Sequence, residues 1–125
     1  MNSSVSRAAG AFLWDAVLIV AFALTGRASH AENLWVGLWT TAWPFLAGVV
    51  VGWLVTLAWR APAAPLRTGL GVWALTLVGG MLLRTASGQG TAVAFIVVAA
   101  VVLLVLLVGW RGIAAIVRRR RLARR

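Results

Sequence analysis

Few polar side chains of this chain could do chemistry, and Asp15 is the most informative of them. It interrupts an apolar run, and a charged side chain at the centre of a membrane-spanning helix costs about 2.5–3.5 kcal/mol even on the more lenient insertion scales. We therefore expect a compensating partner, and a salt bridge that fixes the first helix to its neighbours is the simplest interpretation. The alternative is a relay for protons or cations. Four candidate partners lie near its depth on other predicted helices: Thr56, Arg60, Arg67 and Arg111.

A second polar group falls in two predicted turns on the opposite side of the membrane. Glu32 can pair with Arg84 as a cap between helices, or a small anion or lipid headgroup can bind there. His30 and Glu32 could exchange a proton in hydrolysis, but the sequence offers no supporting catalytic set. We therefore expect no catalytic residues and a protein that is not an enzyme. The candidate residues of this group are Arg27, Ser29, His30, Glu32 and Arg84.

Cysteine is absent and histidine occurs once. This composition excludes disulfides, thiolate nucleophiles and the most common structural zinc ligands. We expect neither a metal site nor a bound cofactor.

The overall composition points to a membrane. Of the 125 residues, 62% are hydrophobic and only 11% are charged, which lies far outside the range of soluble domains. A water-soluble fold of this size could not bury so much apolar surface. Lipid is therefore the expected solvent of most side chains.

Four apolar runs are long enough to cross a bilayer, which needs roughly 20 helical residues. We expect helices at about residues 8–26, 34–59, 66–84 and 91–111, followed by a basic tail at 112–125. Pro62 and Pro65 break the chain between the second and third runs. The prediction is an all-α membrane protein, a single integral domain over residues 1–125 with four transmembrane helices in a small bundle.

The distribution of arginines predicts the orientation. If the four spans alternate, Arg27 and Arg84 flank one side and the other ten arginines flank the opposite side. Basic residues favour the cytoplasmic side, so both termini and the proline turn should be cytoplasmic. The expected location is the bacterial plasma membrane. Such unequal charge argues against an exporter that inserts in both orientations, and leaves a monomer or a parallel homo-oligomer.

Small residues predict where two helices meet. Gly48 and Gly52 form a GxxxG spacing in the second run, and Thr76 and Gly80 share a stripe in the third. Small side chains let backbones approach closely, so we expect these two faces to pack together. The fourth run has no such stripe and is expected to face lipid over most of its surface. Pro44 should bend the second helix, either as a fixed kink or as a hinge, because it cannot donate to the carbonyl four residues earlier.

Eight tryptophans occur, most of them near predicted helix ends, which is typical of the interfacial belts of membrane proteins. The arginine-rich tail should contact anionic headgroups, since each such charge near a membrane contributes about 1 kcal/mol. A protein partner is the alternative for the tail. Nucleic acid is not expected, because the tail has no interleaved aromatic residues. The tail residues concerned are Arg118, Arg119, Arg120, Arg121, Arg124 and Arg125.

Several motifs in order resemble a bacterial membrane family, the domain of unknown function 3054 family. The matching segments are residues 13–15 (Leu-Trp-Asp), 26–32, 41–48 and 79–84, and the resemblance covers about Phe12 to Arg111. The resemblance implies a small polytopic membrane protein, chiefly of actinobacteria, and implies no activity. It adds no site residue to those named above.

The sparse polar inventory favours a non-enzymatic membrane component, a structural or assembly subunit of an envelope complex. The alternative is a small transporter or ion channel, as a monomer or a homo-oligomer, that uses Asp15 on one side and Arg27, His30 and Arg84 on the other. Both interpretations make the lipid bilayer the main partner.

Overall fold

A computed structural model describes residues 3–27 and 34–124, and almost all of them are helical. The long helices are α1 (Ser3–Arg27), α2 (Leu34–Thr56), α3 (Leu70–Ala86) and α4 (Val93–Ala123). Four helical segments are long and apolar enough to cross a membrane, and the third of them, Pro65–Ala86, begins five residues before α3. The chain is therefore an all-α membrane protein with four potential spans, as the sequence predicts.

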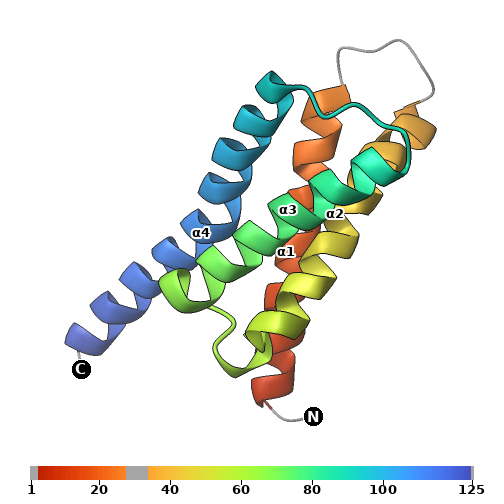
Figure 1. The fold of residues 1–125 in the computed structure, drawn as a ribbon. Coiled ribbons are helices and arrows are strands. Elements are labelled where there is room, and N and C mark those ends of the chain that lie inside the picture. The colour runs from red at the N-terminus through yellow and green to blue at the C-terminus, as the bar shows by residue number, and fades with distance from the viewer. Residues whose placement is uncertain (1–2, 28–33, 125) are drawn as a thin grey trace.

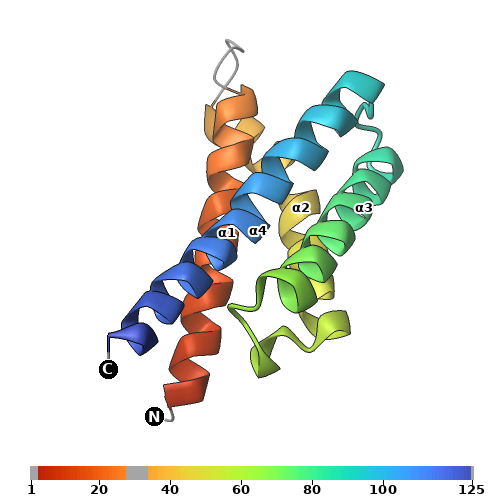
Figure 2. The same ribbon diagram turned by 90° about the vertical axis from the view of Figure 1, so that its left-hand side faces the viewer.

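The four long helices form a bundle in which each helix runs antiparallel to the next one in the chain (Figure 1). α2 packs between α1 and α3, and α4 closes the bundle by contacting both α3 and α1. The view in Figure 2 shows α4 crossing α1 obliquely, so that the two helices diverge on either side of their crossing point. The start of α1, the end of α4 and the α2–α3 connection lie at one end of the bundle (Figure 1).

The α2–α3 connection differs in detail from the expected simple turn. α2 ends at Thr56, three residues before the expected boundary, because Leu57 adopts a left-handed conformation with φ of 52°. A short 3-10 helix, η1 (Ala58–Arg60), and a π-helical turn, η2 (Pro65–Gly69), follow. The hydroxyl of Thr68 donates to the carbonyl of Ala61 at 2.6 Å and braces the loop between them.

The fourth helix is longer than the sequence analysis predicts. The apolar run predicts an end near Arg111, but α4 continues to Ala123, and most of the arginine tail is helical. Arginine and alanine are good helix formers, and the tail contains no proline. A change from apolar to charged residues therefore marks the edge of the apolar segment and not the end of the helix.

Close backbone contact between α2 and α3 explains why glycine occupies three positions of their interface. A Cβ added to Gly48 would lie 2.8 Å from the carbonyl oxygen of Thr76, and one added to Gly52 would lie 3.3 Å from the Cα of Val72. A Cβ at Gly80 would overlap the ring of Phe45. The two small faces therefore pack together, as the sequence predicts.

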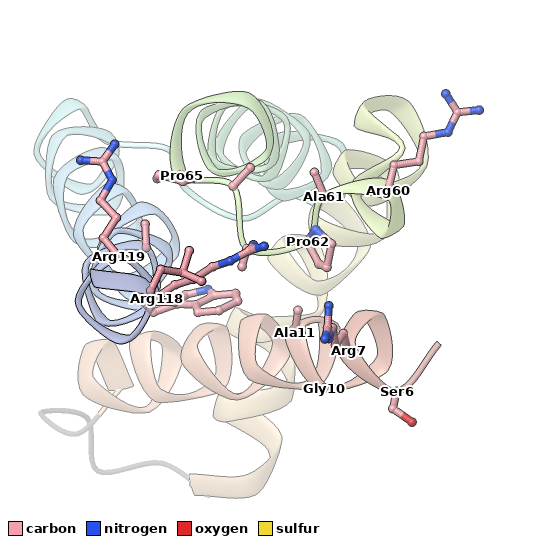
Figure 3. A pocket seen from close by; sticks show the side chains of 16 residues that line it. Ser6, Arg7, Gly10, Ala11, Arg60, Ala61, Pro62, Pro65, Arg118 and Arg119 are labelled. Atoms are coloured by element: carbon pink, nitrogen blue, oxygen red, sulfur yellow. The ribbon is translucent and has the colours of Figure 1, made fainter. Parts of the chain in front are cut away.

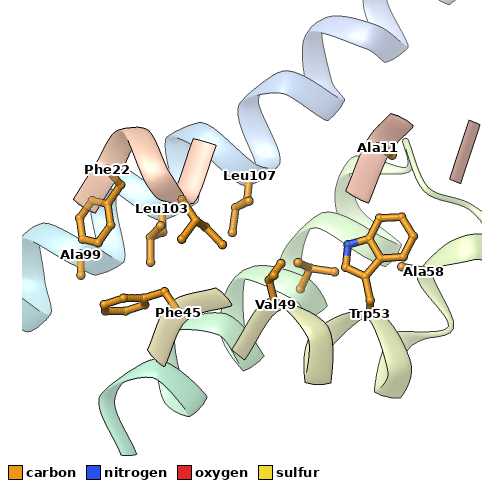
Figure 4. Packing of buried hydrophobic residues seen from close by; sticks show 11 residues of the cluster. Ala11, Phe22, Phe45, Val49, Trp53, Ala58, Ala99, Leu103 and Leu107 are labelled. Carbon is orange, nitrogen blue, oxygen red and sulfur yellow. The ribbon is translucent and has the colours of Figure 1, made fainter. Parts of the chain in front are cut away.

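The remaining core combines aromatic rings and aliphatic side chains (Figure 4). Phe22 and Phe45 make an edge-to-face contact with centroids 5.4 Å apart, and Phe95 of α4 joins them. α4 contributes a narrow buried stripe at four-residue intervals and leaves most of its other positions exposed, as expected for a helix that faces lipid. The stripe consists of Ala99, Leu103, Leu107 and Arg111.

Candidate functional site

The side chain of Asp15 is completely buried inside the bundle, although it is the only acidic residue of α1. It lies on the buried stripe of that helix, one turn after Ala11 and one turn before Ile19. The stripe faces α2 and α4, so the carboxylate meets polar groups from other helices and not lipid.

Four hydrogen bonds converge on this carboxylate. Arg111 of α4 donates from Nη1 to Oδ1 at 3.0 Å and from Nη2 to Oδ2 at 2.7 Å. The indole Nε1 of Trp110 donates to Oδ1, and that of Trp53 in α2 donates to Oδ2, each at 2.8 Å. The arginine is one of the four partners that the sequence suggests. We call Asp15, Trp53, Trp110 and Arg111 the Asp15 cluster.

Arg111 also ties the cluster to its surroundings. Its Nε donates to the carbonyl of Pro62 at 2.8 Å, and its Nη1 donates to the carbonyl of Leu107 at 2.9 Å. The arginine side chain is fully buried and passes Gly69 of η2, where an added Cβ would lie 3.2 Å from its Cδ. One guanidinium thus connects α1, α4 and the α2–α3 loop.

The chemistry of the cluster is that of a closed ion pair. Each carboxylate oxygen accepts two hydrogen bonds, and the opposite charges of Asp15 and Arg111 compensate each other at 0% exposure. Such a pair is strongly destabilised when one partner is removed, because the other remains as a buried charge. The arrangement suits fixing three helices in place and leaves the carboxylate no exposed face for a substrate or a migrating ion.

The polar group at the opposite end is organised around Arg84. Its Nη1 donates to Gln89 at 2.9 Å and its Nη2 to the carbonyl of Gly90 at 2.8 Å, so it caps the α3–α4 turn. Its guanidinium carbon also lies 4.3 Å from the centre of the Phe95 ring. Ser29, His30 and Glu32 and the side chain of Arg27 lie outside the described residues, as does the expected pairing with Glu32.

Pro44 leaves a carbonyl without its helical partner, and Gln89 supplies the replacement. α2 continues through Pro44, whose nitrogen has no hydrogen to donate to the carbonyl of Thr40. The Nε2 of Gln89, in the α3–α4 turn, donates to that carbonyl at 3.0 Å. The proline therefore creates a contact between two elements that are 49 positions apart in the sequence.

Thr76 is the one buried side chain in the described part of the chain whose polar atom finds no partner. It lies at the contact between α2 and α3, where Gly48 approaches its backbone. The described residues contain no group of three histidine, cysteine or acidic side chains that could hold a metal ion.

A cavity of about 770 Å³ opens at the end of the bundle where α1 begins and α4 ends. It lies between the first turns of α1, the α2–α3 loop and the last turns of α4 (Figure 3). The ring of Trp110 forms part of its wall, so the cavity and the Asp15 cluster share one side chain. Four of the side chains that line the cavity are charged: Arg7, Arg60, Arg118 and Arg119.

The fold and this pairing define a class, the multi-pass helical membrane protein whose helices are joined by a buried ion pair. Residues 12–114 match the family model described as "Protein of unknown function (DUF3054)", so the chain belongs to that family. The match includes every residue of the Asp15 cluster. No curated protein and no solved structure matches the chain at a significant level.

Sequence reasoning misses the two tryptophans of the cluster. It assigns most tryptophans to interfacial belts, yet the indoles of Trp53 and Trp110 both donate to Asp15. A buried indole needs an acceptor for its N–H, and a lone acid at a similar depth is the signal that could have linked them. Three other tryptophans near helix ends are exposed: Trp35, Trp39 and Trp59. Trp14 is also exposed, but it lies in the middle of α1.

Proposed function

We propose that this protein is a non-enzymatic component of the bacterial plasma membrane, with both termini in the cytoplasm, that serves as a structural or assembly subunit of an envelope complex. The observation that supports this proposal most is that both carboxylate oxygens of Asp15 already accept two hydrogen bonds each from donors of the same chain. A group that carried protons or cations would need an open acceptor and a path of further polar groups.

The orientation is supported by the arginines. The end of the bundle that holds the start of α1, the α2–α3 loop and the end of α4 also carries nine of the eleven arginines among the described residues. Basic residues are retained on the cytoplasmic side during insertion. A reporter fused after Arg125 should be active only in the cytoplasm.

The replacement Asp15→Asn tests the role. It keeps the size of the side chain but leaves Arg111 as an uncompensated buried charge, which costs about 3–5 kcal/mol. We expect less protein in the membrane and loss of any partner that co-purifies with the natural chain. Arg67→Gln, which changes an exposed loop arginine outside the cluster, serves as the control and should leave both unchanged.

The competing role is a small transporter or channel. Purified protein in liposomes should show no flux of protons or small ions. Transport would be the better account if the natural chain shows a flux and Asp15→Asn loses it while the variant still inserts and melts normally.

A further inference from the structure

We propose that the cavity between α1, the α2–α3 loop and α4 binds the phosphate headgroup of an anionic phospholipid. Figure 3 shows its opening, with Arg118 reaching across toward Pro62 and with Arg60 and Arg119 extending outward. A second hollow of about 660 Å³ adjoins it, and Arg7, Arg118 and three other residues line both. Together they form one site, which we call the arginine cavity.

The charge around the arginine cavity is uncompensated. Within the described chain, no hydrogen bond or ion pair engages Arg7, Arg60, Arg118 or Arg119, and no acidic residue lines either hollow. Asp15, the one acid among the described residues, is already paired with Arg111. A phosphate group accepts charge-assisted hydrogen bonds from several guanidinium groups at once, so an anion of this kind matches the cavity.

The wall of the cavity selects a lipid rather than a soluble phosphate. Apart from the arginines and Ser6, it consists of small or apolar side chains, including Ala11, Ala114 and Leu122. Small residues leave room for the glycerol and the first methylenes of an acyl chain. Its volume also lies in the range of about 300–1,000 Å³ that ligand sites occupy.

The depth of the cavity agrees with this occupant. Of the lining residues on α4, half-buried Trp110 adjoins the buried Asp15 cluster and Arg118 is exposed. They are eight positions apart, which is roughly 12 Å along the helix axis. The headgroup layer of a leaflet is about 5–8 Å thick, and α4 crosses the bundle obliquely. The arginines therefore reach the phosphates while the alanines remain beside hydrocarbon.

Native mass spectrometry of the full chain in neutral detergent measures this binding directly. Only the choice of the cytoplasmic leaflet rests on the orientation proposed above. Lipid binding in detergent micelles does not depend on that orientation, so this measurement tests the cavity by itself. Phosphatidylglycerol should bind at one site at least about tenfold more tightly than phosphatidylcholine, whose headgroup carries no net charge. Equal affinity for the two lipids overturns the proposal, and so does competition by free glycerol phosphate at the same concentration as the lipid.

Matched variants separate the cavity from general attraction to a basic tail. The double replacement Arg7→Gln with Arg118→Gln removes two arginines that line both hollows and should weaken phosphatidylglycerol binding by about tenfold or more. The control double, Arg120→Gln with Arg124→Gln, removes the same charge from exposed tail positions that line neither hollow. It should change the affinity for phosphatidylglycerol by less than about twofold. Equal losses in the two doubles contradict a specific site.

A change of shape at constant charge completes the test. Ala114→Phe fills the space that both hollows share, so it should abolish selective binding while the protein still melts at its usual temperature. Ala94→Phe at the exposed, opposite end of α4 is the control and should bind normally. Undiminished binding by Ala114→Phe overturns the proposal.

Discussion

The guanidinium of Arg111 lies against the carboxylate of Asp15 along two hydrogen bonds of 3.0 and 2.7 Å, and neither side chain is exposed. These residues are 96 positions apart, so the pair joins the first helix to the last. A two-pronged contact of this kind fixes the rotation of both helices as well as their separation, because the guanidinium and the carboxylate are planar. Several variants test what this geometry contributes.

Arg111→Lys keeps the positive charge but not the planar group that donates to Asp15, Pro62 and Leu107. An ammonium is a compact donor on a flexible stem and cannot replace all these contacts. We expect the protein to insert but to lose about 1–3 kcal/mol of unfolding free energy. Unfolding in mixed micelles measures the loss, and an Arg111→Lys protein as stable as the natural chain would show that charge alone matters.

Trp53→Phe and Trp110→Phe remove an indole N–H while keeping an aromatic ring. Each leaves one carboxylate oxygen of Asp15 with a hydrogen bond fewer, which should lower the unfolding free energy by about 1–3 kcal/mol. Trp39→Phe changes an exposed tryptophan and is the control, with an expected change below about 0.5 kcal/mol. Similar melting temperatures for all three variants would mean that the indoles only fill space.

Gly48→Ala tests the contact between α2 and α3. The new Cβ would lie 2.8 Å from a backbone oxygen of Thr76, so the helices must separate, at a cost of about 1–3 kcal/mol. Gly109→Ala has nothing within 4 Å and should be neutral or stabilise α4 by up to about 1 kcal/mol, since alanine favours helix over glycine. Gly48→Ala should therefore lower the unfolding free energy and Gly109→Ala should not. Equal changes in the two variants would argue against close packing at Gly48.

Gln89→Ala should cost about 0.5–1.5 kcal/mol, because the carbonyl of Thr40 loses the donor that replaces the missing N–H of Pro44. In a Pro44→Ala background the helix itself supplies that N–H, so the same change should cost less there. A double-mutant cycle on the four proteins measures the difference. Independent effects of the two replacements would mean that Gln89 does not serve the proline.

Much of this architecture is predictable because a bilayer imposes simple rules on a chain. The four apolar runs, the small faces with Gly48 and Gly80, and the exposed character of most of α4 follow from length, side-chain size and hydropathy. The need of Asp15 for a partner follows from the cost of placing a charge in hydrocarbon. Each of these inferences needs only the type and spacing of residues along one or two helices.

The remaining features depend on rotation and depth, which composition does not determine. Four candidates lie near the level of Asp15, and the choice of Arg111 depends on the rotation and oblique crossing of α4. The roles of Trp53 and Trp110 depend on the same angle. The continuation of α4 to Ala123 escapes the sequence analysis because the end of an apolar run is not the end of a helix.

A double-mutant cycle between Asp15 and Arg111 is the most direct test of the account. The unfolding free energies of the natural chain, Asp15→Leu, Arg111→Met and the double variant would be compared in the same micelles. Each single replacement leaves a buried charge and should cost about 3–5 kcal/mol, whereas the double variant should lose far less than the sum of the two. Losses that add to within about 0.5 kcal/mol would show that the two residues act independently and would contradict the account.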